Sequence, residues 1–160
     1  MNGKTNYEMV KEFNNVFGVE KESKFVDEVF DNKKLVKLRM DLIREEMQEL
    51  EDAVEQRDRK EVIDALSDIL YVVYGMGDCL GINLDHSFDI VHRSNMSKIA
   101  DTEKQAIESG EQYKQSGTYD SPVYRSIEVD GVEKYLIYNE STKKVLKNKD
   151  YTKANFDDML

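Results

Sequence analysis

The stretch DALSDILYVVYG, residues 64–75, has the composition of a helix that is apolar on almost every side. Two aspartates, Asp64 and Asp68, interrupt it one helical turn apart and therefore lie on one face. The apolar pattern predicts a buried helix over residues 59–81. Because a buried carboxylate without a partner destabilises a protein strongly, something must compensate these two charges.

The preceding segment, LVKLRMDLIREEMQELEDAV, predicts an amphipathic helix over residues 33–57. Its apolar residues form two adjacent stripes. The first recurs at spacings of three and four and consists of Val36, Met40, Ile43, Met47, Leu50 and Val54, and the second consists of Leu35, Leu38, Leu42 and Ala53. Glu46 and Glu49 project into the second stripe, where the pattern favours leucine or alanine. The short link EQRDRK makes the two helices antiparallel neighbours, so their two carboxylate pairs are expected to converge.

Four like charges in a partly dry site are tolerated when cations neutralise them. Carboxylate oxygens suit a hard cation, and Mg²⁺ is the first choice because it keeps waters and bridges to phosphates. The sequence has no cluster of Cys and His that a softer metal would require. The alternative interpretation is that REEMQELED is an ordinary solvated helix face. Acids within the apolar stripes of two successive helices favour the metal site.

Two further helices are predicted, over residues 6–17 and 85–97. The first carries Met9, Val10, Phe13 and Phe17 on one face. The predicted fold is therefore all-α: a four- to five-helix antiparallel bundle that occupies residues 1–100.

After residue 100 the composition becomes polar. The segment DTEKQAIESGEQYKQSG indicates a short exposed helix or a loop. Two β-rich runs then flank Asp130-Gly131, a residue pair favoured in two-residue hairpin turns, and KKVLKN can add a third short strand. Residues 101–160 are thus expected to form a C-terminal extension with a small β hairpin.

The chain has 160 residues and a net charge of −10. An acidic surface argues against binding to nucleic acid or to anionic membranes. No apolar run is long enough to span a bilayer, and the N-terminal residues lack the apolar core of a secretory signal. The single cysteine, Cys79, excludes an intrachain disulfide and suits a reducing, cytoplasmic location.

The segment VHRSNMSK ends the fourth predicted helix and places Asn95 and Lys98 on one face. An amide and a lysine beside a metal site can hold phosphate and a base or sugar. Equally, Lys98 can simply suit the negative end of the helix dipole. Tyr71 can stack on a substrate, although a tyrosine on such a helix is more often a core residue.

Together, EEMQE, EVIDALSDILYVVYG and VHRSNMSK resemble the all-α nucleoside triphosphate pyrophosphohydrolases. This MazG-like group also contains phosphoribosyl-ATP pyrophosphohydrolase and the dimeric dUTP pyrophosphatases. The resemblance covers residues 6–98, and the C-terminal tail resembles the extension of a phosphoribosyl-ATP pyrophosphohydrolase-like branch. The group's fold is an all-α bundle, as expected from the helical periodicity.

The signature of the group is EExxE on one helix and ExxD on the next. The first half matches as Glu45, Glu46 and Glu49. The second half departs from it, because Ala65 occupies the glutamate position that precedes Asp68. Asp64 then substitutes for that glutamate, whereas a second register pairs Glu61 with Asp64.

The resemblance implies hydrolysis of a (d)NTP to (d)NMP and pyrophosphate, in nucleotide-pool housekeeping. It implies Mg²⁺, which Mn²⁺ can replace, and a homodimer or homotetramer. The metal ligands implied are Glu46, Glu49, Asp64 and Asp68, with Glu61 as an outer ligand. The catalytic residues implied are Glu45, Glu46 and Glu49, and the substrate-binding residues are Asn95, Lys98 and Tyr71.

Three alternatives remain beside this hypothesis. The enzyme can be a phosphoribosyl-ATP pyrophosphohydrolase, or the chain can be a non-catalytic helical interaction module. A di-iron carboxylate bundle is disfavoured because it requires two Glu-x-x-His motifs, and the nearest match is a single Asp89-x-x-His92.

Overall fold

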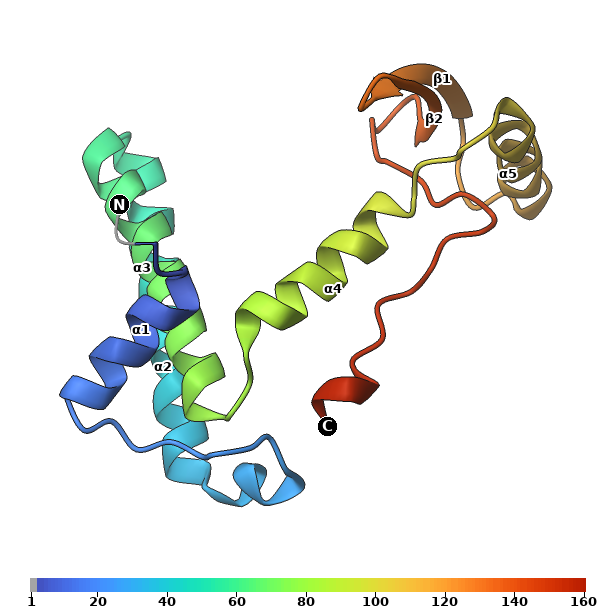
Figure 1. Ribbon diagram of the computed structural model, residues 1–160. Coiled ribbons are helices and arrows are strands. Elements are labelled where there is room, and N and C mark those ends of the chain that lie inside the picture. Colours follow the sequence, from blue (N-terminus) through green and yellow to red (C-terminus); the bar gives the residue numbers. More distant parts are fainter. Residues whose placement is uncertain (1–2) are drawn as a thin grey trace. The chain divides into compact units, whose positions relative to one another are not determined.

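A computed structural model describes residues 3–160 of the chain (Figure 1). Contacts between Cα atoms divide the chain into two compact units. The first unit comprises Met1–Phe88 together with Phe156–Leu160, and the second comprises Asp89–Asn155. Residues 1 and 2 lie outside the described part. The predicted division into a helical domain of residues 1–100 and an extension of residues 101–160 stays a prediction.

The first unit is helical, as predicted, and its helices agree with the predicted ranges to within about two residues. They are α1 (Asn6–Val16), the 3₁₀ helix η1 (Asp27–Asp31), α2 (Lys33–Gln56), α3 (Arg59–Cys79) and the start of α4 (Leu84–Met96). The C-terminal 3₁₀ helix η2 (Asp157–Met159) also belongs to this unit. There His86 Nε2 lies 2.9 Å from Asp158 Oδ2, which links the chain end to the start of α4.

A tight turn makes α2 and α3 antiparallel neighbours. Arg57 ends α2 in the left-handed conformation, with φ of 57°. Asp58 then starts α3, because its Oδ1 accepts hydrogen bonds from the backbone N–H groups of Lys60 (2.9 Å) and Glu61 (3.3 Å). The two residues reverse the chain and place the two acidic segments opposite each other.

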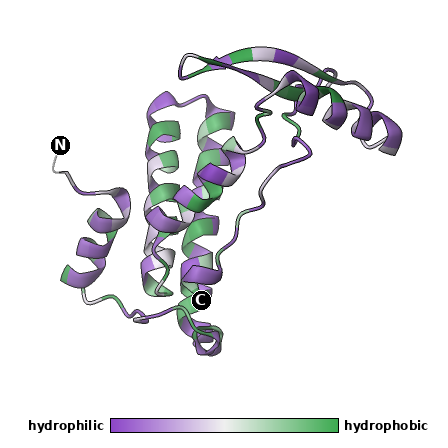
Figure 2. Ribbon diagram, turned by 45° about the vertical axis from the view of Figure 1, so that its right-hand side comes forward, coloured by the Kyte–Doolittle hydropathy of each residue, from purple (hydrophilic) through white to green (hydrophobic). Residues whose placement is uncertain are grey.

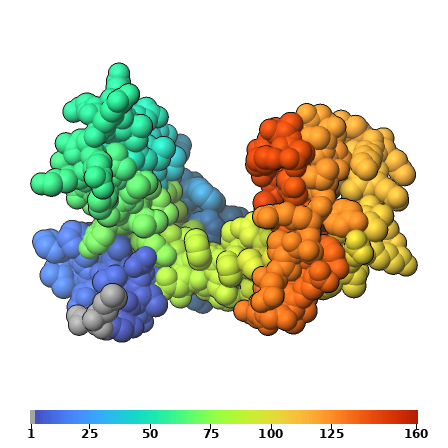
Figure 3. Space-filling view, turned by 90° about the horizontal axis from the view of Figure 1, so that it is seen from above, coloured from blue at the N-terminus to red at the C-terminus, as the bar shows by residue number. Residues whose placement is uncertain are grey.

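Helix α1 packs against α3, and the space-filling view shows its blue residues against the green ones (Figure 3). The face that it buries is Tyr7, Val10 and Asn14. Phe13 and Phe17, which the apolar pattern had placed on the same face as Val10, are exposed and stack on each other with ring centroids 4.3 Å apart. The buried face is offset because Asn14 forms a specific hydrogen bond with α3.

The prediction that α3 is buried is wrong for much of its length. A stripe at spacings of three and four is exposed: Ile63, Leu66, Leu70 and Val73. Ala65 and the last turns of α3 are buried instead. Apolar periodicity shows that a face avoids water, but it does not show whether the covering partner lies in the same chain.

Helix α2 buries the second of its two apolar stripes more deeply than the first. Leu35 and Ala53, at the ends of the second stripe, are buried. Met47 and Val54 of the first stripe are exposed. Both α2 and α3 therefore carry apolar residues, coloured green in Figure 2, that stay exposed within residues 3–160.

The second unit contains α5 (Glu103–Ser116), β1 (Pro122–Val129) and β2 (Val132–Asn139). The predicted hairpin is confirmed: its turn places Asp130 and Gly131 at φ of 51° and 75°. The core of the second unit consists of Ala100, Ala106, Ile137 and Leu146. The segment that was expected as an exposed helix or loop is α5, which packs on both strands. KKVLKN contributes a single bridge, between Val145 and Tyr138.

The expected fold class, all-α with a small C-terminal hairpin, is confirmed. Among the described residues, no single helix is long and apolar enough to cross a membrane, and only α3 and α4 taken together as a bent pair satisfy that length and composition.

Candidate functional site

The carboxylates of α2 and α3 converge around Glu46. Burial raises the pKa of Glu46 above its ordinary value, and the neighbouring charges of Glu49, Asp68, Glu45 and Asp64 raise it further. Glu46 and Asp68 are half-buried, whereas the other three carboxylates are exposed. The five acids therefore form one interacting cluster at the α2–α3 interface, with Glu46 at its centre.

This acidic cluster has no counter-charge in the described chain. Within residues 3–160, none of its five side chains makes an ion pair or a side-chain hydrogen bond. The nearby cations Lys37 and Arg44 both pair with Asp41 on the polar side of α2. The pKa of Asp41 is lowered, chiefly because Lys37 donates a hydrogen bond to it. On the same helix, therefore, the pKa of paired Asp41 lies below its ordinary value and that of unpaired Glu46 lies above it.

The donor set fits a hard divalent cation. Five carboxylates from two helices offer oxygen ligands of the kind Mg²⁺ prefers, and the raised pKa of Glu46 reflects repulsion that a cation would relieve. Nowhere in residues 3–160 are three potential ligands close enough together to enclose one ion. Metal binding would therefore require the exposed side chains to rotate inward, toward Glu46 and Asp68.

Other predicted residues lie around this cluster. Glu61 is exposed in the first turn of α3. Tyr71, one turn after Asp68, is partly exposed and meets Phe13 of α1 edge-on, with ring centroids 5.6 Å apart. Asn95 and Lys98 belong to the second unit, where Lys98 Nζ donates to Asn95 Oδ1 at 2.6 Å. Their role toward a substrate stays a prediction.

The sequence pattern missed a buried polar contact between α1 and α3. Asp78 is only 3% exposed, and its Oδ2 accepts a hydrogen bond from Asn14 Nδ2 at 2.9 Å, with Lys21 Nζ at 3.5 Å. The pKa of Tyr7 is raised by burial and by the neighbouring charge of Asp78. Asn14 could have been noticed, because it follows Val10 by one turn on an otherwise apolar face.

Comparison with known protein families identifies the family of this chain. A family model described as phosphoribosyl-ATP pyrophosphohydrolase matches residues 10–95, which contain the whole acidic cluster. The chain belongs to this family. The family is part of the MazG-like all-α NTP pyrophosphohydrolase superfamily, so the resemblance seen in the sequence is confirmed.

The chain is also 32% identical to a viral protein, "Uncharacterized protein L479" of Acanthamoeba polyphaga mimivirus. That alignment covers 98% of this chain and 96% of the viral protein. The similarity therefore includes the whole second unit, of which the family model covers only residues 89–95. Members of the phosphoribosyl-ATP pyrophosphohydrolase family act on phosphoanhydride bonds, and the chain is an enzyme of this nucleotide pyrophosphohydrolase kind.

Proposed function

We propose that the protein is a Mg²⁺-dependent nucleoside triphosphate pyrophosphohydrolase that converts a (d)NTP and water to (d)NMP and pyrophosphate. One observation carries the proposal: the carboxylates of Glu45, Glu49, Asp64 and Asp68 surround that of Glu46, and no cation among the described residues pairs with these five acids. Such a cluster is unfavourable in isolation and becomes favourable when divalent cations and a polyphosphate complete it.

In this proposal Glu46, Glu49, Asp64 and Asp68 hold the metal, and Glu61 is an outer ligand. Bound Mg²⁺ supplies charge neutralisation for the phosphate oxygens and lowers the pKa of a bound water. A carboxylate of this set that the metal does not fully engage orients the attacking water, and Glu45, which is exposed, is a weaker candidate for that role. Glu46 and Glu49 belong to the catalytic set because they fix the position of the phosphates relative to that water.

Asn95 and Lys98 are proposed to contact the substrate. Lys98 is a cation with three donors, and its present acceptor is the neutral Asn95 amide. A phosphate oxygen would be a stronger acceptor for Lys98 than this amide, because both groups then carry charge. Asn95 would then be released to contact another part of the substrate.

A second candidate substrate is phosphoribosyl-ATP, because the matching family is described by that reaction. The same metal and carboxylates serve both substrates, since each presents a phosphoanhydride to water. The two candidates differ in the groups attached beyond the phosphates, and the acidic cluster does not distinguish them.

The deciding experiment measures pyrophosphate release from each NTP, each dNTP and phosphoribosyl-ATP, with Mg²⁺, with Mn²⁺ and with a chelator. The proposal expects metal-dependent release from a nucleoside triphosphate, with the monophosphate as second product. Preference for phosphoribosyl-ATP would select the second candidate. Absence of release from every substrate would refute both.

We also propose that the protein assembles as a homodimer or homotetramer. The exposed stripe of α3, formed by Ile63, Leu66, Leu70 and Val73, has the spacing of a helix-packing seam. Contiguous apolar surface of this kind is unfavourable in water and marks an interaction site. Light scattering should give the mass of two or four chains, and Leu66→Glu should shift the mass toward one chain.

A further inference from the structure

Helices α1 and α3 line a partly open pocket of about 270 Å³. Asn6 and Met9 of α1 form one side, and Ser67, Leu70 and Tyr74 of α3 form the other. Tyr71 also lines it. All of these residues belong to the first unit, so the pocket is a feature of one compact body.

The pocket combines apolar walls with unused hydrogen-bonding groups. Met9, Leu70 and the tyrosine rings provide the apolar surface. Within residues 3–160, the Asn6 amide and the hydroxyls of Tyr71 and Tyr74 make no hydrogen bond. Ser67 Oγ donates to the carbonyl of Ile63 at 2.8 Å, which leaves its lone pairs free to accept. Small-molecule sites have this composition: mostly apolar, with a few polar groups that fix orientation.

Along α3, residues that line the pocket neighbour Asp68 of the acidic cluster. Ser67 precedes Asp68 directly, and Tyr71 follows Asp68 by three residues, which is about 4.5 Å along the helix axis. Tyr71 shares the helix face of Asp64 and Asp68 and also lines the pocket. A ligand whose charged end reaches Asp68 through a metal can therefore place an aromatic end beside Tyr71.

We propose that this pocket binds the base of the nucleotide, and that Asn6, Ser67 and Tyr74 determine which base is accepted. The inference rests on the proposed function, because it places the base of the same nucleotide whose phosphates are proposed to bind at the acidic cluster. A base has an apolar, stackable face and an edge of donors and acceptors, which match the tyrosine rings and the Asn6 amide. Helix α1, which carries none of the acids, is then the specificity element.

The test compares kcat/KM for the set of NTPs and dNTPs in the full-length protein and three variants. Ser67→Phe fills the pocket from its exposed rim, and Asn6→Ala removes the amide. Ser126→Phe is the matched control, because Ser126 is exposed on β1 in the second unit. Thermal melting checks folding, light scattering checks assembly, and Mg²⁺ tripolyphosphate, which has no base, serves as a competitor for the acidic cluster.

We expect Ser67→Phe to raise KM for the preferred nucleotide at least about tenfold, the equivalent of one lost favourable contact of 1.4 kcal/mol. Asn6→Ala should reduce the ratio of kcat/KM between the best and worst base by about tenfold, because it loses the hydrogen bond that distinguishes them. Inhibition by tripolyphosphate should stay the same in all variants, and Ser126→Phe should behave as the wild type.

Three results would overturn the inference. An active wild type whose base preference is unchanged in both Ser67→Phe and Asn6→Ala would show that the pocket does not hold the base. Equal loss for every nucleotide with a changed oligomer mass would show that a second copy covers the pocket. A wild type that hydrolyses no nucleotide would instead refute the proposed function, and the inference with it.

Discussion

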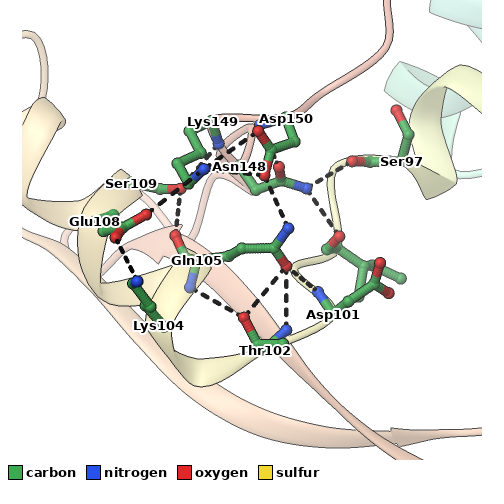
Figure 4. A network of polar contacts seen from close by, with 11 residues as sticks. Ser97, Asp101, Thr102, Lys104, Gln105, Glu108, Ser109, Asn148, Lys149 and Asp150 are labelled. Atoms are coloured by element: carbon green, nitrogen blue, oxygen red, sulfur yellow. Dashed lines mark hydrogen bonds and ion pairs between the residues drawn. The ribbon is translucent and has the colours of Figure 1, made fainter.

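The protein has two polar clusters that are built in opposite ways. In the second unit, Gln105 Oε1 accepts from the N–H groups of Asp101 and Thr102, while Gln105 Nε2 donates to Asp150 at 2.8 Å (Figure 4). Asn148 donates to two backbone carbonyls and accepts from the N–H of Asp150. The acidic cluster of α2 and α3 has, among the described residues, no such partners.

This contrast separates groups that stabilise the fold from groups available to a ligand. A satisfied network gains stability from every hydrogen bond and leaves nothing for a substrate. A cluster of repelling carboxylates costs stability, and its retention is explained by binding or catalysis. Helix α3 contains both kinds: Asp78 is buried and bonded to Asn14, whereas Asp68 faces other acids.

Glu46→Gln should produce the largest effect. The amide keeps the shape of the side chain but loses the charge at the centre of the cluster, so kcat should fall on the order of a hundredfold or more, as for loss of a charged catalytic group. Without metal, the melting temperature should be unchanged or higher, because repulsion from Glu49, Asp68, Glu45 and Asp64 is reduced. Steady-state kinetics and calorimetry measure the two quantities.

Glu51→Gln is the control, because Glu51 is exposed on α2 outside the cluster. It should keep wild-type turnover. Two results would contradict this prediction: a Glu46→Gln variant that remains active, or one that melts at a much lower temperature in the absence of metal. Either result would mean that the acidic cluster stabilises the fold, as the polar network of the second unit does, and is not reserved for a ligand.

Asn148→Ala should have the largest effect on stability. Asn148 is 6% exposed, and its Nδ2 donates to the carbonyls of Ser97 and Ile99, both at 2.8 Å. Truncation leaves these carbonyls and the N–H of Asp150 without their partners, which should lower the free energy of unfolding by about 3 kcal/mol. Denaturant unfolding measures it, with Gln112→Ala, an exposed amide on α5, as control. An equal, small change in both variants would show that the network is not a stabilising device.

Mg²⁺ should stabilise the wild type by slightly less than Asn148→Ala destabilises it. A ligand that binds only the folded state adds about 2.7 kcal/mol when its concentration is one hundred times Kd. The melting temperature should therefore rise with Mg²⁺ in the wild type and much less in Asp68→Asn, which loses one proposed ligand. A rise of the same size in both proteins would place the binding site elsewhere, and no rise at all would favour a non-catalytic helical module.

The sequence predicted the helices and the hairpin because their signals are local. The apolar spacing of a helix and the Asp130-Gly131 turn each act within a few residues. It also predicted that α2 and α3 are antiparallel neighbours, because the link between them is short. The ligand and catalytic roles of their acids stay a prediction. It failed where the partner is distant: the Asn14–Asp78 contact spans 64 positions. The prediction that α3 is buried was wrong for a related reason, because an apolar stripe on a helix does not identify the element that covers it.

The two clusters should finally differ in the sign of their pH dependence. Hydrogen bonds from Gln105 and then Lys149 lower the pKa of Asp150 below its model-compound value of 3.8, whereas burial and neighbouring acids raise the pKa of Glu46 above 4.5. The contribution of Asp150 to stability is therefore present above pH 3.8 and is lost as the pH falls through its folded-state pKa. Glu46 destabilises the metal-free protein above its raised pKa, and this penalty disappears as the pH falls toward 4.5.

Melting of the wild type, Asp150→Asn and Glu46→Gln with a chelator, from pH 3 to 8, resolves the difference. Asp150→Asn should melt below the wild type at neutral pH and approach it in acid. Glu46→Gln should melt at or above the wild type at neutral pH, and the wild type should gain on it as the pH falls. Both shifts should be small, because Asp150 is exposed and Glu46 is only half-buried. If the melting temperatures of all three proteins changed with pH in parallel, Asp150 and Glu46 would not differ in their effect on stability, and the contrast between the two clusters would be wrong.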